Sequence, residues 1–202
     1  DTFPPTGNQI DYQFTLPETT TLIFDAVTGS PNFSYAVKNA NSFGVYASNT
    51  FDSDTSNYSS RFIILNAGTY QLSLNRPVVS GALTTEPFSF RLAALNQVLG
   101  TAISLGTPLT ASLVTGSTTA AHQFSVQAGD RISITPAVTG GGALTWRLFN
   151  ALGNLVVNAN PSTNPLIGFY INTPGQYTLL VDGALSNAGH LDYQLSVTLD
   201  SH

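Results

Sequence analysis

The sequence predicts an all-β protein built from two tandem antiparallel β-sandwich modules. Short segments alternate between apolar and polar residues, as in Tyr70-Gln71-Leu72-Ser73-Leu74, which is typical of a strand with one buried face. Such segments recur about every 8–12 residues with turn residues between them, the spacing expected of sandwiches and barrels. The apolar segments are rich in Thr, Val, Ile, Phe and Tyr, which favour strands over helices.

An internal repeat divides the chain into two modules. Three pairs of segments carry it most clearly, and their order along the chain is kept. The pairs are Tyr12-Gln13-Phe14 with His122-Gln123-Phe124, residues 62–74 with residues 169–181, and residues 88–92 with residues 193–197. Similarity that keeps its order indicates two copies of one fold. We expect module one to span residues 1–97 and module two residues 98–202.

Module two carries additional sequence at its front. Residues 101–113 alternate weakly and contain Gly106 and Pro108, so we expect one or two strands there that open the module. Module one has only residues 1–9 before its matching point, and its opening strand is expected to be missing or supplied differently. The short linker near residues 97–100 predicts limited flexion between the modules.

Composition favours an extracellular protein and argues against several classes of partner. Charged residues make up 8% of the chain, against about 25% in an ordinary soluble domain, so Thr, Ser, Asn, Gln and Gly must supply the surface. The net charge of −5 argues against binding to nucleic acid or to anionic membranes. No apolar run approaches the roughly 20 residues of a membrane span. We expect a secreted or cell-surface fragment of a larger bacterial protein.

Absence of cysteine and methionine excludes disulfides, thiolate nucleophiles and cysteine-based metal sites. Hydrolase signatures are missing as well, because the sequence has neither a Gly-x-Ser-x-Gly elbow nor His-Glu-x-x-His. A triad through His190 and Asp192 would need a nucleophile that the sequence does not identify. His122 lies opposite Tyr12 in the repeat and is expected to occupy an ordinary sheet position. We therefore expect no enzymatic activity.

Turn and strand motifs of module two resemble those of bacterial pre-peptidase C-terminal domains. These motifs are Phe124-x-Val126-x-Ala128-Gly129-Asp130, Asn150-x-x-Gly153-Asn154-x-Val156, Pro174-Gly175-x-Tyr177-x-Leu179-x-Val181 and Tyr193-x-Leu195-x-Val197. Module one keeps the Gly-x-Tyr-x-Leu-x-Leu strand but has Glu18-Thr19-Thr20 in place of Ala-Gly-Asp. The resemblance implies jelly-roll sandwiches attached to secreted proteases or repeated in adhesins. It carries over no ligand set.

Two loop regions of module one are candidate binding sites. Asp52, Asp54 and Asn57 supply oxygen side chains within one short segment, and calcium requires 6–8 such ligands. The segment lacks the glycine and distal glutamate of an EF-hand, so a polar loop with Asx turns is the competing interpretation. No other cofactor is expected.

Aromatic residues in polar sequence give the second candidate, a glycan-binding face. Tyr46, Phe51 and Tyr58 are the residues concerned, because carbohydrate modules stack sugars on exposed rings. Trp146 aligns with Tyr35 in the middle of a strand and is expected to pack in the core.

The sequence therefore predicts a non-catalytic structural or adhesive module pair from a large bacterial surface or secreted protein. Its expected partners are the neighbouring modules of the parent chain. The alternative is a carbohydrate- or protein-binding module appended to a secreted enzyme, with a surface glycan or protein as partner. Exposure of Tyr46, Phe51 and Tyr58 would favour that alternative, and their burial would favour the structural role.

Overall fold

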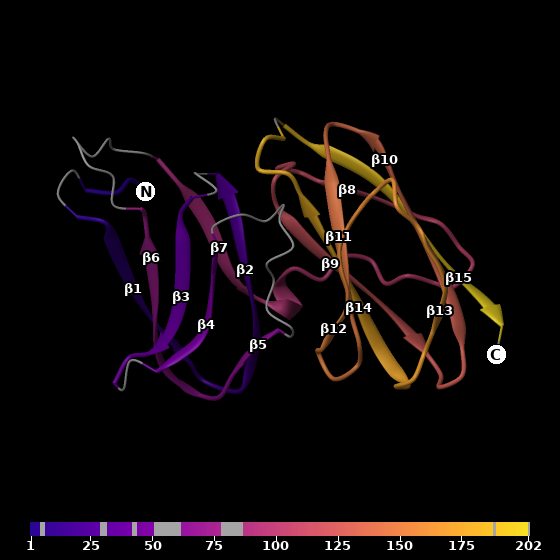
Figure 1. Ribbon diagram of the computed structural model, residues 1–202, viewed down its shortest axis with the longest axis horizontal. Coiled ribbons are helices and arrows are strands. Elements are labelled where there is room, and N and C mark those ends of the chain that lie inside the picture. Colours follow the sequence, from indigo (N-terminus) through magenta and orange to yellow (C-terminus); the bar gives the residue numbers. More distant parts are fainter. Residues whose placement is uncertain are drawn as a thin grey trace.

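The computed structural model describes residues 1–4, 7–28, 32–41, 44–50, 62–77, 87–187 and 189–201. Within these ranges the chain forms two β-sandwiches side by side, with module one at the N-terminal end (Figure 1). The prediction of an all-β fold with two antiparallel sandwiches is confirmed. No helix of the described residues has the length and apolar character needed to cross a membrane.

Module one consists of two facing antiparallel sheets. Their orders are β1-β6-β3-β4 and β5-β2-β7. The strands are β1 (Gln9–Leu16), β2 (Thr20–Thr28), β3 (Ser34–Asn39), β4 (Val45–Thr50), β5 (Ile63–Leu65), β6 (Gly68–Asn75) and β7 (Ser89–Ala94).

Module two has the same arrangement with one further strand. Its sheets have the orders β12-β11-β14-β9 and β13-β10-β15-β8. The strands are β8 (Leu109–Leu113), β9 (Thr119–Val126), β10 (Arg131–Gly140), β11 (Leu144–Phe149), β12 (Leu155–Pro161), β13 (Leu166–Tyr170), β14 (Gly175–Gly183) and β15 (Leu191–Ser201). Strand β8 lies in the stretch where the sequence predicts an opening strand.

Strand pairing follows the sequence repeat closely. Phe14 of β1 faces Tyr70 of β6, and Phe124 of β9 faces Tyr177 of β14. Each tyrosine hydroxyl donates to a backbone carbonyl four residues earlier, that of Asn66 at 2.8 Å and that of Thr173 at 3.0 Å. The turns before β6 and β14 are therefore the same structure in both copies, as their sequences indicate.

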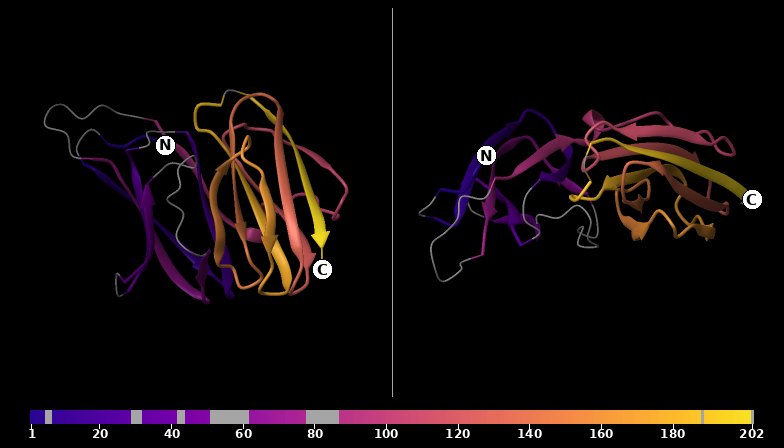
Figure 2. Two further views of the ribbon diagram at one scale, coloured as in Figure 1. Left: turned by 45° about the vertical axis from the view of Figure 1, so that its right-hand side comes forward. Right: turned by 90° about the horizontal axis from the view of Figure 1, so that it is seen from above.

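The described part of the chain has a separate core inside each sandwich. In module one, aromatic side chains dominate, and Phe24 stacks on Tyr35 with ring centroids 3.8 Å apart. In module two the core is mainly aliphatic around Trp146, which is completely buried as expected. The four sheets lie one behind another along the long axis, and Figure 2 shows the two sandwiches next to each other. Buried apolar side chains of both modules fill the space between them.

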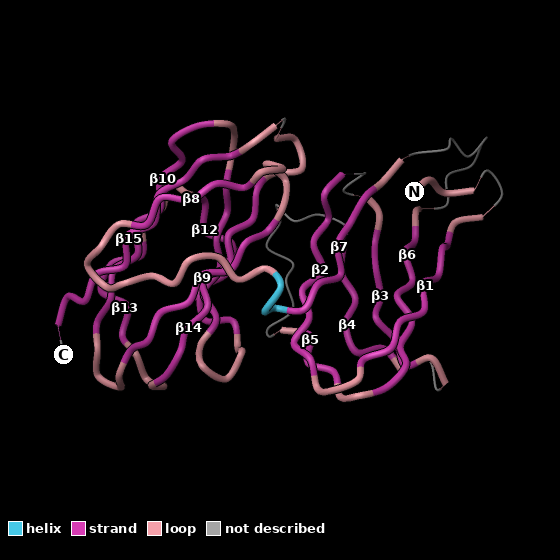
Figure 3. Tube along the Cα trace, turned by 180° about the vertical axis from the view of Figure 1, so that it is seen from behind, coloured by secondary structure: helices cyan, strands magenta, loops and turns pink. Residues whose placement is uncertain are grey.

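A short connection joins the modules. After β7 the chain forms a 3-10 turn, η1 (Leu95–Gln97), and then runs beside β9, where Leu99 and Ala121 form a parallel bridge. Figure 3 shows this segment crossing directly from one sandwich to the other. The connection is bonded to module two from Val98 onward, because the Ala121 N–H donates to the Val98 carbonyl at 2.8 Å.

Candidate functional site

The contact between the modules is the most developed feature outside the two cores. Side chains alternate between the faces of a strand, and several strands at this contact are buried on both faces. On β2, Phe24 faces the core of module one while Ile23 faces module two; on β11, Trp146 faces the core and Phe149 faces module one. The buried apolar residues of the junction are Ile23, Phe62, Ala93, Val98, Ala121, Phe149 and Leu180.

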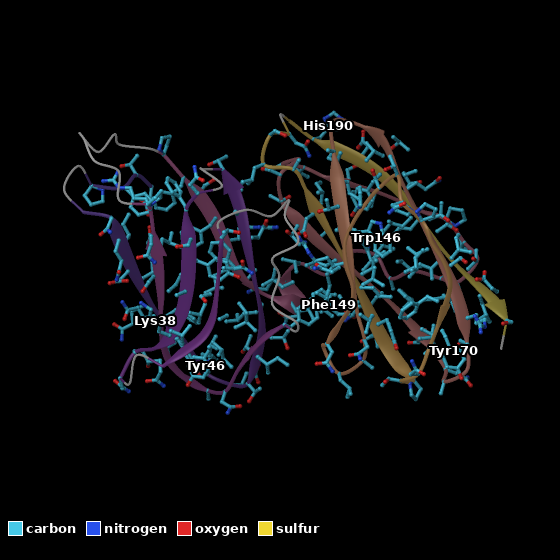
Figure 4. The ribbon with its side chains drawn as sticks, viewed as in Figure 1. Lys38, Tyr46, Trp146, Phe149, Tyr170 and His190 are labelled. Carbon is cyan, nitrogen blue, oxygen red and sulfur yellow. The ribbon has the colours of Figure 1, made fainter. Side chains whose placement is uncertain are left out.

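An aromatic pair lies at the centre of this junction. Phe62 of module one stacks on Phe149 of module two, with ring centroids 3.9 Å apart and an interplanar angle of 14°. Figure 4 shows Phe149 on the side of module two that faces module one. The backbone also crosses here, because the Phe62 N–H donates to the Gly153 carbonyl at 3.1 Å. The two modules are thus joined by packing and by a main-chain hydrogen bond.

Charged residues are buried beside the aromatic pair. Arg147 of β11 forms an ion pair with Asp182 of β14, and the two side chains are 0% and 1% exposed. Both residues alternate with core residues on their strands and point toward module one. Taking two charges out of water costs much of the attraction between them, so removing one partner of this pair would leave a costly unpaired charge in the junction.

Asp25 of β2 is the partner from module one. Its carboxylate accepts hydrogen bonds from the Arg91 Nε at 2.7 Å and from the Thr119 backbone N–H at 3.2 Å. Arg91 in turn donates from Nη2 to the Thr119 carbonyl at 2.8 Å. Burial raises the pKa of the Asp25 carboxyl, against the lowering effects of Arg91 and Thr119. Module one therefore holds an edge of module two through charge-assisted bonds.

A single hydroxyl connects the two acidic residues across the junction. Thr119 Oγ1 lies 3.0 Å from Asp25 Oδ1 and 2.5 Å from Asp182 Oδ1. A hydroxyl has one hydrogen to donate, so both contacts are hydrogen bonds only when one carboxyl carries a proton.

Sequence reasoning did not identify the junction, although a signal exists. Leu22-Ile23-Phe24 and Tyr177-Thr178-Leu179-Leu180-Val181 are nearly continuous apolar runs, which indicate strands buried on both faces. The charged residues at the ends of these runs, Asp25 and Asp182, resemble the ordinary end of a strand. Asp25 and Asp182 come together at Thr119 only because segments far apart in the sequence are in contact.

Of the three aromatic residues considered for glycan binding, Tyr46 lies within the described part of the chain. It is on β4 and is 54% exposed, and its hydroxyl accepts a hydrogen bond from Asn39 Nδ2 at 3.4 Å. Its ring also contacts the buried Tyr70 edge-on. Phe51 and Tyr58 lie outside the described residues, so a shared aromatic face stays a prediction.

The calcium hypothesis likewise stays a prediction. Asp52, Asp54 and Asn57 all lie outside the described residues. Within the ranges that the structure does describe, no three His, Asp or Glu side chains come together in a way that could hold a metal ion.

The hydrogen bonds around Asp192 differ from those of a catalytic triad. His190 Nε2 lies 3.1 Å from Asp192 Oδ2, and the Ser112 hydroxyl donates to Asp192 Oδ1 at 2.6 Å. The carboxylate thus lies between the histidine and the serine. In a triad the histidine has the central place, because it accepts the proton of the nucleophile. The expected sheet position of His122 is found on β9.

His122 is buried, and both of its ring nitrogens have hydrogen-bond partners. Its Nδ1 lies 2.8 Å from the Thr101 carbonyl, which can only accept, so Nδ1 carries the hydrogen. Its Nε2 lies 2.7 Å from the Tyr193 hydroxyl and accepts from it. Burial is the main cause that lowers the pKa of His122 below its ordinary value of 6.5.

We expect this histidine to make the protein less stable in mild acid. A pKa that is lower in the folded state contributes stability that is present above the unfolded-state value of 6.5 and is lost as the pH falls below it. The free energy of unfolding should therefore decrease by up to about 1.4 kcal/mol per pH unit. Urea denaturation at several pH values should give a free energy of unfolding that depends less steeply on pH in His122→Gln than in the unmodified protein. His190→Gln, which replaces an exposed histidine, is the control. If both variants reduce the pH dependence of the free energy of unfolding equally, that dependence does not come from His122.

Comparisons with known proteins give likenesses to solved structures alone. No family model matches the chain, and no curated protein does. The chain is similar to the pre-peptidase C-terminal domain of a collagenase from Bacillus anthracis. This match has 29% identity and a TM-score of 0.39 and covers 48% of this chain and 93% of that domain. The motifs of module two resemble those of the same kind of domain.

Two further solved structures illustrate the range of the likeness. Aeromonas hydrophila PliG, a periplasmic inhibitor of g-type lysozyme, has 14% identity and a TM-score of 0.42 over 50% of this chain and 97% of its own. The secreted serine protease VesC from Vibrio cholerae has 10% identity and a TM-score of 0.34, and the match covers 96% of this chain and 47% of the protease.

Proposed function

We propose that the chain is a rigid, non-catalytic pair of modules that positions neighbouring parts of a large secreted or cell-surface bacterial protein. The observation that carries this proposal is the buried junction. A flexible pair of domains would share a small, polar and hydrated contact. Here an aromatic stack and hydrogen bonds cross between the modules and cover an ion pair of module two, which supports a single orientation.

Composition supports an extracellular setting. With charged residues at 8%, the exposed surface consists mainly of uncharged polar groups, and the sulfur-free chain is insensitive to oxidation of cysteine or methionine. On this proposal the partners are the adjoining modules of the parent chain. An adhesive role, with contact to a surface glycan or protein, belongs to the same proposal, and the exposed ring of Tyr46 supports it.

Distance measurements between two spin labels test the rigidity directly. The chain has no cysteine, so Ser48→Cys on β4 and Thr163→Cys beyond β12 label one exposed position in each module. We expect one narrow distance distribution that does not change with salt concentration. A broad distribution, comparable to that of two domains on a flexible tether, would overturn the proposal. Single-label samples control for mobility of the labels themselves.

A further inference from the structure

A polar cleft opens at one end of the junction between the modules. It has a volume of about 380 Å³, which lies within the range of small-molecule binding sites. Module one contributes residues 18–21, the end of β7 and the connection contribute residues 94–96 and Leu99, and module two contributes Gln123 and Gln176. Figure 3 shows the turn η1, drawn in cyan, between the two sandwiches. The cleft is therefore built by both modules and by the segment that joins them.

The cleft continues the strand faces that form the junction. Successive side chains of a strand alternate between its two faces, so residues two or four positions apart lie on the same face. On β9, Ala121 belongs to the buried junction and Gln123 lines the cleft. On β14, Leu180 belongs to the junction and Gln176 lines the cleft. Thr21 of β2 completes this set from module one. The facing sheets are thus in contact at their apolar residues and open at their polar ones.

One wall of the cleft is the turn at which module one departs from the motif of module two. Module one has Glu18-Thr19-Thr20 where module two has Ala128-Gly129-Asp130. In module two the buried Asp130 closes the turn, because its carboxylate accepts from the Gln127 N–H at 2.8 Å. In module one the Thr20 hydroxyl instead donates to the Glu18 carbonyl at 3.0 Å. The carboxylate of Glu18 therefore takes no part in the turn and is available at the cleft.

Several polar side chains at the cleft have no hydrogen-bond partner within the described part of the chain. They are the carboxylate of Glu18, the hydroxyl of Thr21 and the amides of Asn96 and Gln176. Gln123 is held in place because its Nε2 donates to Thr178 Oγ1 at 3.3 Å, and its Oε1 is left to accept. Hydroxyl and amide groups, which both donate and accept, therefore line the cleft from both modules.

The chemistry of these groups selects a neutral ligand that is rich in hydroxyl groups. Among the described residues that line the cleft none is Lys, Arg or His, and Glu18 is the single acid, so an anionic ligand would find no counter-charge. Sugar hydroxyls both donate and accept, as the amides and threonine hydroxyls of the cleft do. Leu95 and Leu99 supply apolar contact for the C–H face of a sugar ring.

We propose that this cleft binds a short neutral saccharide. The Glu18 carboxylate accepts from sugar hydroxyls on the side of module one, and the amides of Asn96, Gln123 and Gln176 donate and accept on the other sides. The inference rests on the proposed function, because the cleft keeps its shape only while the junction holds the two modules in one orientation. Such a site gives the pair an adhesive surface that neither module has alone.

Titration of isotopically labelled protein with maltotriose, cellotriose and mannotriose tests the site. The side-chain amides of Asn96, Gln123 and Gln176 give their own signals, and we expect at least one of these neutral trisaccharides to shift all three. Glu18→Gln should weaken binding about tenfold, because hydrogen bonds to a charged group are lost, and Gln176→Ala about fivefold. Gln194→Ala removes an exposed amide from the sheet of module two that faces away from the junction, and it should leave binding unchanged.

Three other results would overturn the proposal in different ways. If none of the sugars shifts the amides of the cleft, the saccharide site is wrong, while the rigid pair is judged separately by the distance distribution between the spin labels. Shifts confined to the surroundings of Tyr46 would place the sugar on β4 instead of the cleft. Tighter binding of the acidic trisaccharide trigalacturonate, or of the uncharged peptide N-acetyl-trialanine amide, than of any neutral sugar would show that the class of ligand is wrong.

Discussion

Replacing Asp182 with alanine is expected to lower the free energy of unfolding by about 3–5 kcal/mol, because it leaves the guanidinium of Arg147 in the buried junction without its carboxylate. The loss should appear in urea denaturation followed by the fluorescence of Trp146, the single tryptophan of the chain. Because this side chain is completely buried in module two, its signal reports that module.

A double variant separates the cost of an unpaired charge from the value of the pair. Replacing Arg147 with methionine and Asp182 with leucine removes both charges while keeping similar volume. Such replacements are often neutral or stabilising, so the double variant should be clearly more stable than Asp182→Ala alone. A loss below about 1 kcal/mol for the single variant would show that water reaches the arginine, and would contradict the buried junction.

The second large loss of stability is expected when Phe149 is replaced with alanine. Removal of a buried phenylalanine costs about 3–5 kcal/mol in general, and here it also removes the ring that stacks on Phe62. We expect the two modules to unfold separately in this variant. The midpoint from Trp146 fluorescence, which reports module two, should then differ from the midpoint of far-UV circular dichroism, which reports both modules. In the unmodified protein the two midpoints should coincide, since coincident transitions indicate cooperative unfolding.

Phe124→Ala is the matched control for that experiment. Phe124 is also buried, at 3% exposed, but it belongs to the internal core of module two. Its replacement should destabilise the protein by a similar amount while affecting the contact between the modules much less. If Phe124→Ala separates the two midpoints as far as Phe149→Ala does, the junction does not couple the modules.

Local patterns in the sequence were sufficient to predict the sandwich modules. Alternation around Tyr70 and Tyr177 marked β6 and β14, and the repeat aligned Phe14 with Phe124 in equivalent registers. The core position of Trp146 followed from its place in the middle of a strand. These features depend on residues near each other in the chain and on period-two burial, which a single sequence displays.

The junction could not be predicted in the same way. Asp25, Thr119 and Asp182 come from three strands separated by 63 to 94 positions in the chain, and nothing in their local sequence pairs them. The loop residues considered for calcium and glycan binding lie outside the described ranges and remain predictions.

The junction brings together two faces that are not equivalent in the repeat. Module one contributes its β5-β2-β7 sheet, whereas module two contributes β12-β11-β14-β9, whose counterpart in module one is the sheet on the far side. A contact of this kind is heterologous, so it does not close on itself as a two-fold dimer does. Each further copy added by the same rule would leave the same kind of face open at the end. Repeated in this way, the junction would build an open-ended rod whose twist is set by a single kind of contact.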